Sequence, residues 1–515
     1  MKTINLLFGF ILLLFASVTV KAQRIYYSEP DREDLRQLKF EILGKYNSQY
    51  LVYKNTRANH IISVYDSEMK QKDKIILDFI PDRAFNVDVF GHPEHGIVLY
   101  QFQKKSTVYC MGVMIDGNGK KIGEPLELDT TQIGIFGDNK IYSVIISDDK
   151  QKLMVFKIKN KQRDDLQIQT VLLSHNLMPI RKSGFTYHLE TIKESIADFY
   201  LDNEGNFLFS HVTRPSQREF INEAKLVVLP VYSDTVKTYA LKLDKVYLDE
   251  LRIKVDNTNG RYVLTSLYSK TRHGNIDGLF SAVVDKDLNS PGIERATEFS
   301  DEFRSAAKGE TSNRLAFNDY YLKHLIVKKD GGILVTGEST YGSSRGSSYN
   351  RWDNPWMWGS PLYPGSYWGW NPWNNWGYGS WGMYGIGSPY GSFSSPARYY
   401  AENIMVLSLD KEGKIIWQSV VAKSQYDDNN DNLLSYQIMN SGSELLFLYN
   451  EWNRRSPMLN AQSLDPSGQV AKQPPLRSLD KGYEFMIRMG KQVGAREMIV
   501  PCLYRNSFSF ARIEF

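Results

Sequence analysis

A short motif recurs along the chain, and this repeat limits the fold more than any other feature. In each copy an apolar strand ends at an aspartate, and three of the four copies carry a glycine three residues later. The copies are VMIDGNG (113–119), AVVDKDL (282–288), LSLDKEG (407–413) and QSLDPSG (462–468). Asp116 and Asp285 are 169 residues apart, or three steps of about 56, and Asp410 and Asp465 are 55 apart. A repeat of this length is what a β-propeller requires.

The segments between these motifs have the character of β-strands. Short runs rich in Val, Ile, Leu, Phe and Tyr, such as GIVLYQF, KLVVLPVY and RYVLTSLY, alternate with polar or glycine-containing turns. Long helical periodicity is nearly absent, so the chain is predicted to be all-β. An aspartate side chain can cap a type I turn, and glycine supplies the positive φ of a bulged hairpin. We therefore place the aspartate turns between the third and fourth strands of each repeat.

Four strands per repeat predict a single propeller of eight blades. Seven units begin near residues 38, 83, 136, 194, 250, 318 and 431. The C-terminal runs YEFMIRM, EMIVPCLY and SFSFARIEF supply three more strands, and RIYYSEP near the N-terminus can supply the fourth. That pairing would close the ring between the two ends of the chain and remove an exposed sheet edge. Seven blades, or two separate β-domains, are the alternatives.

The N-terminal 22 residues have the pattern of a secretory signal peptide. Lys2 is followed by an apolar stretch over residues 4–16, and Val20-Lys21-Ala22 places small residues before Gln23. Cleavage there would leave a propeller domain of residues 23–515. An uncleaved membrane anchor is the alternative, but the apolar run is shorter than the roughly 20 residues that span a bilayer. We expect no transmembrane segment in the mature chain.

Charge and cysteine content exclude some partners. The formal net charge of +4 falls to about +2 without the two lysines of residues 1–22, which gives no electrostatic case for nucleic acid. Cys110 and Cys502 lie in apolar runs of blades that the repeat places apart. We interpret both as buried, small apolar residues and not as a disulfide.

Residues 340–398 interrupt the repeat with a segment rich in Trp, Gly and Tyr. It falls between the second and third strands of one blade, so we expect it to project from one face of the propeller. A mobile low-complexity loop, an aromatic surface for a partner protein, and a sugar-stacking or outer-membrane contact are the three interpretations. The candidate binding residues are eight of the ten tryptophans: Trp352, Trp356, Trp358, Trp368, Trp370, Trp373, Trp376 and Trp381.

No strong catalytic or cofactor motif is present. The sequence lacks HExxH, GxSxG, a P-loop and a Rossmann glycine pattern. The pair in His92-Pro93-Glu94-His95 could ligate a metal, but we interpret it as a solvent-exposed turn. The oxygen-rich segment Asp427–Asn432 lacks the spacing of a calcium loop and is interpreted as a solvated connection between blades. We predict no catalytic residue, no metal ligand and no cofactor.

One repeat resembles the quinoprotein-like propeller motif. Residues Leu409 to Trp417, LDKEGKIIW, are similar to the docking motif Asp-x-x-Thr-Gly-x-x-x-Trp, although the threonine is missing and the unit is one residue shorter. The resemblance implies a propeller in which Trp417 packs between neighbouring blades, and it does not imply a quinone cofactor.

The whole chain resembles exported β-propeller proteins of Bacteroidota. The resemblance depends on this unit, on the Val-Lys-Ala-Gln end of the signal pattern and on Tyr-Tyr-x-Glu-Asn-Ile at 399–404. It implies export and the fold but no residue role. The sequence shows no C-terminal sorting domain of the kind that type IX secretion cargo carries. We therefore expect a periplasmic or outer-membrane location.

These features favour a non-catalytic binding or scaffold protein of the cell envelope, which contacts a protein partner through the aromatic insertion. A density of exposed aromatic residues this high would favour aggregation without a partner. The alternative is a carbohydrate-binding or carbohydrate-active propeller that uses its central funnel, with a polysaccharide as ligand.

Overall fold

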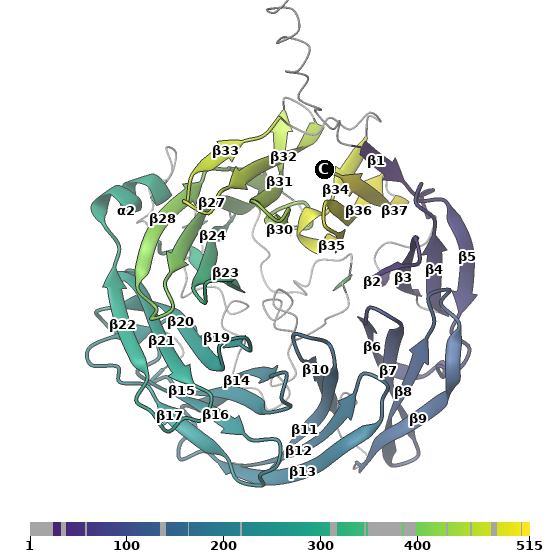
Figure 1. The fold of residues 1–515 in the computed structure, drawn as a ribbon, viewed down its shortest axis with the longest axis horizontal. Coiled ribbons are helices and arrows are strands. Elements are labelled where there is room, and N and C mark those ends of the chain that lie inside the picture. The colour runs from purple at the N-terminus through teal and green to yellow at the C-terminus, as the bar shows by residue number, and fades with distance from the viewer. Residues whose placement is uncertain are drawn as a thin grey trace, which may run out of the picture.

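Eight β-sheets are arranged radially around one axis in the computed structural model, as predicted (Figure 1). We number the sheets as blades 1 to 8. The structure describes residues 24–31, 38–56, 59–133, 141–162, 164–216, 219–308, 317–344, 347–348, 384–385, 398–428, 431–453, 456–474, 482–505 and 507–515.

The first four blades each consist of four consecutive antiparallel strands. Blade 1 contains β2 (Lys39–Tyr46), β3 (Gln49–Thr56), β4 (Asn59–Tyr65) and β5 (Gln71–Ile76). Blade 2 contains β6 (Ala84–Gly91), β7 (Gly96–Lys104), β8 (Thr107–Ile115) and β9 (Lys121–Gln132). Blade 3 contains β10 (Tyr142–Ile146), β11 (Lys152–Gln162), β12 (Asp165–Ser174) and β13 (Pro179–His188). Blade 4 contains β14 (Glu194–Leu201), β15 (Phe207–Thr213), β16 (Glu223–Leu229) and β17 (Lys237–Ala240).

The remaining blades keep this plan with short additions. Blade 5 contains β18 (Tyr247–Leu248), β19 (Arg252–Asp256), β20 (Arg261–Ser269), β21 (Gly278–Asp285) and β22 (Ile293–Glu298). Blade 6 contains β23 (Tyr320–Val327), β24 (Ile333–Ser344), β27 (Arg398–Leu409) and β28 (Ile415–Val421), with β25 (Ser347–Ser348) and β29 (Gln425–Asp427) at its end. Blade 7 contains β30 (Tyr436–Asn440), β31 (Leu445–Asn453), β32 (Ser456–Leu464) and β33 (Val470–Lys472).

Blade 8 joins the two ends of the described chain. Its C-terminal strands are β34 (Tyr483–Phe485), β35 (Lys491–Gly494), β36 (Glu497–Tyr504) and β37 (Ser507–Glu514), with the short 3₁₀ turn η4 (Ile487–Met489) between the first two. The N-terminal strand β1 (Arg24–Tyr27) pairs with β37 in antiparallel register, with Arg24 opposite Glu514. This confirms the predicted closure, which leaves the ring without a gap between its ends.

Eight large clusters of buried hydrophobic side chains, counted among the described residues, fill the eight gaps between neighbouring blades. In one of them Leu51 of blade 1 packs with Val98 and Val113 of blade 2. Both faces of a blade are therefore covered, which explains why the middle strands read as continuous apolar runs and not as strict alternation.

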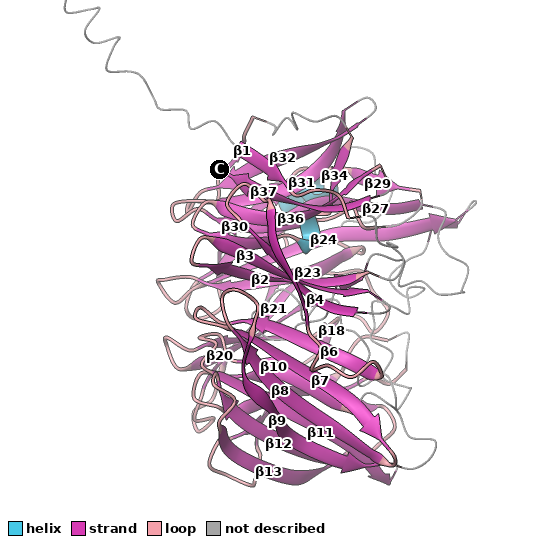
Figure 2. Ribbon diagram, turned by 90° about the vertical axis from the view of Figure 1, so that its right-hand side faces the viewer, coloured by secondary structure: helices cyan, strands magenta, loops and turns pink. Residues whose placement is uncertain are grey.

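The antiparallel order of each blade defines two faces of the ring. Turns between first and second strands, and between third and fourth strands, lie on one side, which we call the 1–2 face. Turns between second and third strands lie on the other, which we call the 2–3 face. Figure 2 shows the disc edge-on, with the strands running from one face to the other.

The predicted aspartate turns all lie between the third and fourth strands, on the 1–2 face. In the first, the Asp116 carboxylate accepts the backbone N–H groups of Asn118 and Lys120, both at 2.9 Å, and Gly119 has a φ of +80°. Asp66 forms the same turn in blade 1, although Met69, with a φ of +62°, takes the position of the glycine. This copy was not recognised in the sequence, although the Asp285 copy also lacks the glycine and has Leu288, with a φ of +57°, in its place.

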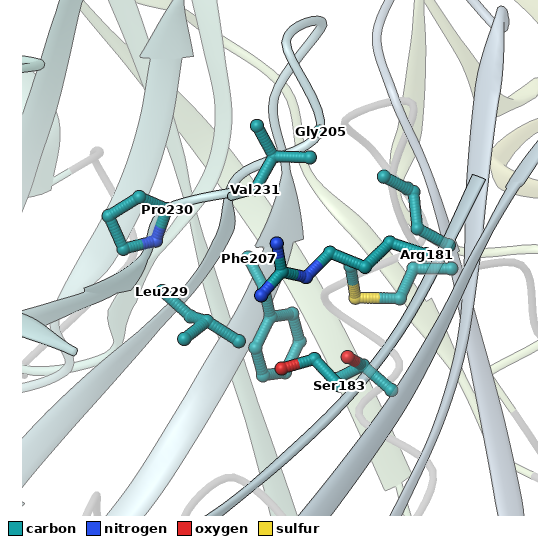
Figure 3. Close-up of a pocket in the computed structure, with 10 residues that line it drawn as sticks. Arg181, Ser183, Gly205, Phe207, Leu229, Pro230 and Val231 are labelled. Carbon is teal, nitrogen blue, oxygen red and sulfur yellow. The ribbon is translucent and has the colours of Figure 1, made fainter. Parts of the chain in front are cut away.

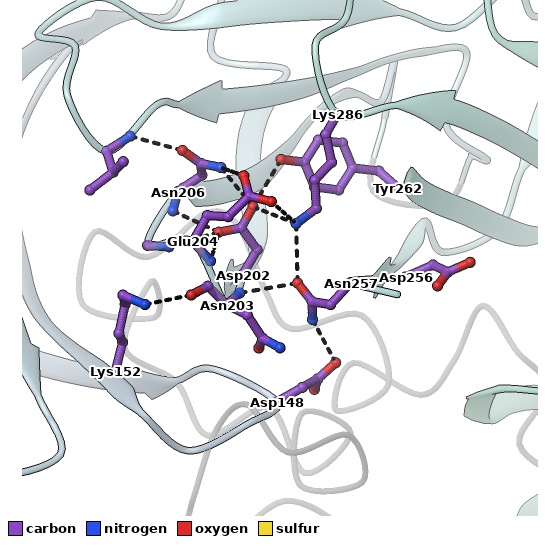
Figure 4. Close-up of polar contacts among 12 residues, drawn as sticks. Asp148, Lys152, Asp202, Asn203, Glu204, Asn206, Asp256, Asn257, Tyr262 and Lys286 are labelled. Carbon is purple, nitrogen blue, oxygen red and sulfur yellow. Dashed lines mark hydrogen bonds and ion pairs between the residues drawn. The ribbon is translucent and has the colours of Figure 1, made fainter. Parts of the chain in front are cut away.

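Hydrogen bonds between turns of adjacent blades tie the 1–2 face together (Figure 4). The backbone N–H of Asp149 donates to the Asn203 side chain at 3.2 Å, and the N–H of Asn203 donates to Asn257 at 3.1 Å. Each step is 54 residues long, so equivalent turns of blades 3, 4 and 5 are linked in series. Lys286 adds an ion pair to Asp202 at 3.2 Å.

A single α-helix is present in the described part of the chain, α2 (Asp301–Lys308), on the connection between blades 5 and 6. Ser300 precedes it and accepts the N–H of Phe303 at 3.2 Å, and Phe303 is buried. Within the described residues, no helix has the length and apolar character needed to cross a membrane.

Candidate functional site

All eight tryptophans of the predicted binding set, from Trp352 to Trp381, lie outside the described residues. The structure describes the strands that carry the insertion, β24 and β27, and two short pieces of it, β25 and β26 (Tyr384–Gly385). The insertion falls between the second and third strands of blade 6, as predicted, and therefore leaves the ring on the 2–3 face.

Blade 6 continues beyond its own first and fourth strands. The inner strand β23 pairs with β24 only as far as Ser339, and β28 pairs with β27 only from Ile404 onward. Past these limits, residues 340–343 of β24 still pair with residues 398–401 of β27, and β29 pairs with 399–401 on the other side. The result is a three-stranded extension on the 2–3 face (Figure 2).

Three tyrosines stand in register across this extension. Tyr341 is the direct cross-strand partner of Tyr400, and Tyr400 is the direct partner of Tyr426. The Tyr341 and Tyr400 rings stack with centroids 4.6 Å apart and an interplanar angle of 13°, and the Tyr400 and Tyr426 centroids are 6.4 Å apart. We call Tyr341, Tyr400 and Tyr426 the tyrosine row. Tyr426 is 48% exposed, so the row has an open end.

Polar groups hold the tyrosine row in place. The Tyr341 hydroxyl donates to the Glu402 carboxylate at 3.0 Å. The Arg398 guanidinium lies 4.7 Å from the centre of the Tyr426 ring, and its Nη2 donates to Asp428 at 3.2 Å. Attachment to two long strands and these contacts fix the rings before any ligand arrives, which lowers the entropy cost of binding.

The tyrosine row was not predicted from the sequence. Tyr399 and Tyr400 were noted only as part of a family resemblance, and residues 340–344 were assigned to the insertion and not to a strand. Neither RYYAEN nor STYGSS alternates apolar and polar residues, so strand periodicity gave no signal for the extension.

The described piece β26 shows where one part of the insertion goes. Tyr384 is opposite Phe40 and Gly385 is opposite Lys39, at the first residues of β2 in blade 1. Figure 1 shows β2 on the inner side of its blade. Because β2 runs toward its turn with β3 on the 1–2 face, its first residues lie at the 2–3 face. Residues 384–385 therefore lie on the inner side of blade 1, on the same face as the tyrosine row.

The oxygen-rich segment beside this extension is neutralised by arginines. Asp431 forms a bidentate ion pair with Arg488, at 2.6 and 3.0 Å, and Asp428 pairs with Arg398. Asn429 and Asn430 lie outside the described residues. The arginine pairs take up both of these carboxylates, which supports the interpretation of a connection between blades.

A second polar cluster lies on the inner strands of blades 4 and 5. The Arg252 guanidinium is 3.6 Å from Asp198 and 2.7 Å from Glu250. Asp198 has a φ of +50° in a β-bulge of β14, and it is 4% exposed. Burial raises the pKa of Asp198 and, despite the attraction of Arg252, raises the pKa of Glu250 to about 7. Strained backbone and raised carboxyl pKa values are features that also occur at active sites.

The turn that contains His92 and His95 differs from the prediction. Both histidines are 5% exposed, so the interpretation as a solvent-exposed turn is wrong for them, whereas Pro93 and Glu94 between them are exposed. The cause lies in blade 3, whose His175 covers the turn with its ring centroid 4.6 Å from that of His92. Burial and the neighbouring imidazoles lower the pKa of His92 to about 4.

A small pocket between blades 3 and 4 is lined by Arg181, Ser183, Phe207 and Leu229, among others (Figure 3). Arg181 pairs with Asp234 at 2.8 Å beside it. The volume of the pocket is about 10 Å³, which is room for about one water molecule. The pocket is too small for an organic ligand.

Cys110 and Cys502 are buried free thiols in blades 2 and 8, as predicted.

No family model matches the sequence, and no curated protein matches it. Similar solved structures include apo prolyl oligopeptidase B from Galerina marginata, with 8% identity over 91% of this chain and a TM-score of 0.39. This chain spans 56% of the length of that protein. An apocarotenoid oxygenase mutant from Synechocystis is similar with 8% identity over 96% of this chain and 93% of its own length, at a TM-score of 0.32. Both TM-scores are low, so neither likeness carries an inference about activity.

Proposed function

We propose that this protein is a non-catalytic binding protein, in which a rigid β-propeller presents the tyrosine row and the aromatic insertion beyond it to a protein partner. The observation that carries the proposal is the three-stranded extension of blade 6, in which Tyr341, Tyr400 and Tyr426 stand in register. Tyrosine offers a large, rigid contact area with a polar end, which is why it is enriched at binding hot spots.

The arrangement of the 2–3 face supports the same proposal. The eight tryptophans lie in the chain segment between the ends of β24 and β27, and residues 384–385 of that segment pair with β2 of blade 1. A partner that binds the tyrosine row would thus meet the face on which residues 384–385 also lie.

We further propose that the protein works in the cell envelope, in the periplasm or at the outer membrane. The signal-peptide pattern of residues 1–22 supports this location. N-terminal sequencing of the native protein checks it: a chain that begins at Gln23 agrees with export, and a chain that retains residues 1–22 contradicts cleavage.

The first prediction concerns the tyrosine row. A variant with Tyr341→Ala, Tyr400→Ala and Tyr426→Ala should capture its partner from envelope extract at least about tenfold more weakly, because hot-spot aromatic residues each contribute more than about 1 kcal/mol. Tyr232→Ala is the matched control, since Tyr232 is 83% exposed on blade 4. Quantitative pull-down measures the effect, and circular dichroism checks that the variants fold. Equal capture by the triple variant and the control would contradict the proposal. Capture of a polysaccharide in place of a protein would instead indicate a sugar-binding function.

The cluster of Asp198, Glu250 and Arg252 favours a second candidate, a carbohydrate-active propeller. Two carboxyl groups with raised pKa values could supply an acid and a base for glycoside hydrolysis. Turnover of a polysaccharide that is lost in Asp198→Asn and kept in the tyrosine-row variant would support this candidate over the first.

A further inference from the structure

Three histidines from two blades meet on the 1–2 face, opposite the proposed binding face. His92 and His95 lie in the turn between β6 and β7 of blade 2, and His175 lies in the turn between β12 and β13 of blade 3. The ring centroids are 4.6 Å apart for His92 and His95, 4.6 Å for His92 and His175, and 5.7 Å for His95 and His175. The ligand atoms of His92, Glu94 and His95 all lie within 4.8 Å of one another.

A hydrogen bond sets the tautomer of one of these rings. The Nε2 of His95 is 2.9 Å from the backbone carbonyl oxygen of His175, so this nitrogen carries a proton and donates it. The lone pair of the neutral His95 ring is therefore on Nδ1. In His92 the Nδ1 is 3.3 Å from the backbone N–H of Glu94, and the Nε2 is 3.2 Å from the side-chain nitrogen of Gln151. Both neighbours are N–H donors, so either ring nitrogen of the neutral His92 can present its lone pair.

The third ring has an unexplained nitrogen. The Nδ1 of His175 is buried, and no hydrogen-bond partner for it is present among the described residues. A buried polar atom without a partner costs free energy unless a water molecule or an ion meets it. The ring that carries it packs against the rings of His92 and His95.

The backbone around the cluster is held firmly. Within the turn the N–H of His92 donates to the carbonyl of His95 at 2.9 Å, and the Tyr46 hydroxyl of blade 1 donates to the same carbonyl at 3.1 Å. The Lys150 ammonium of blade 3 donates to the Gly91 carbonyl at 2.9 Å. The turn that carries His92, Glu94 and His95 is thus positioned by contacts that do not depend on a ligand, as a metal site requires.

We propose that His92, Glu94 and His95 form a zinc site on the 1–2 face, with His175 of blade 3 packed over it. Two imidazole nitrogens and one carboxylate oxygen are a donor set that binds Zn²⁺ and leaves one tetrahedral position open. The His175 carbonyl would act as a positioning group, because it accepts the proton of the His95 Nε2, the ring nitrogen that does not bind metal. This site is independent of the proposed binding function.

The test is a titration of the chelator-treated full chain with Zn²⁺, followed by calorimetry. We expect one equivalent to bind in the wild type, and binding to weaken at least tenfold in His92→Ala and in His95→Ala. His188→Ala is the matched control, since His188 is an exposed histidine that pairs with Asp165 on the edge of blade 3, and it should bind zinc like the wild type.

Two further measurements remain informative if a variant folds poorly. Zinc should raise the melting temperature of the wild type and leave that of His95→Ala unchanged. X-ray absorption of the zinc-loaded wild type should show imidazole nitrogen in the first shell. A first shell of oxygen only, no binding by the wild type, or equal binding by the His92 and His188 variants would overturn the proposal.

Discussion

Glu41 is a charged side chain in an environment that disfavours its charge. It lies on β2, it is 3% exposed, and one of its carboxylate oxygens has no hydrogen-bond partner among the described residues. The other oxygen is 3.3 Å from the Lys491 ammonium of blade 8. Burial outweighs the attraction of Lys491 and raises the pKa of Glu41 from 4.5 to about 7. Between these values the folded protein binds more protons than the unfolded chain, so its stability falls as pH rises.

Replacing this carboxyl group should remove that pH dependence. Since one pKa unit corresponds to about 1.4 kcal/mol, the loss between pH 4.5 and 7 is on the order of 3 kcal/mol. The free energy of unfolding of Glu41→Gln should therefore vary less over this window than that of the wild type, as measured by denaturant titration at several pH values. Glu68→Gln, at an exposed turn, is the control and should keep the wild-type slope. Identical slopes for Glu41→Gln and the wild type would show that Glu41 is ionised in the folded protein throughout.

Residues whose role depends on near neighbours in the sequence could be predicted, and residues buried by another blade could not. The bonds of Asp116 are made within its own turn, so the motif was sufficient. The burial of His92 and His95 depends on His175, about 80 residues later, and the periodicity of one turn carries no information about that contact. The exposed-turn interpretation was wrong for this reason.

At the scale of elements, the contact between blades 6 and 7 has an identifiable anchor. Trp417 on β28 packs against Gly468 in the aspartate turn of blade 7, and its Nε1 donates to the Pro466 carbonyl at 3.2 Å. The position of Trp417 between neighbouring blades agrees with the expectation from its motif. A Cβ at residue 468 would lie 2.7 Å from the Trp417 ring, so only glycine fits there.

Comparison of two glycine substitutions should separate the contribution of the Trp417 contact to stability from the cost of backbone strain. The first substitution is Gly468→Ala. Gly442→Ala is the matched control, because Gly442 has a similar φ, +96° against +91°, but open space where a Cβ would be. Both variants carry the strain of a positive φ, and Gly468→Ala also forces the Trp417 ring to move, which costs an additional 1–3 kcal/mol or so. Urea unfolding measures the difference. Equal destabilisation would mean that the Trp417 contact adds nothing to the stability of the ring.

The blade starts were predictable from the repeat, whereas the edges of the insertion were not. Strands begin at Lys39, Ala84, Glu194 and Tyr320, close to the expected 38, 83, 194 and 318. The repeat, however, contains no information on how far β24 and β27 continue past their neighbours. The pairing of residues 340–343 with 398–401 is set by their own cross-strand contacts and not by the blade.

At the scale of the whole molecule, the ring separates two kinds of surface. The 1–2 face is covered by short turns that bond to one another from blade to blade, as Asn203 does with Asn257. The 2–3 face carries the extension of blade 6, the tyrosine row and residues 384–385. Closure through β1 and β37 keeps these surfaces on opposite sides of a rigid disc. We therefore expect a protein partner on one face only.

A photo-crosslinking comparison of the two faces of blade 6 tests this expectation most directly. A benzoylphenylalanine is placed at Tyr426, in the tyrosine row, or at Glu412, in the exposed aspartate turn on the opposite face of the same blade. After irradiation in envelope extract, we predict a specific protein adduct from position 426 and none from position 412. Adducts of equal yield at both positions, or an adduct only at position 412, would contradict the account.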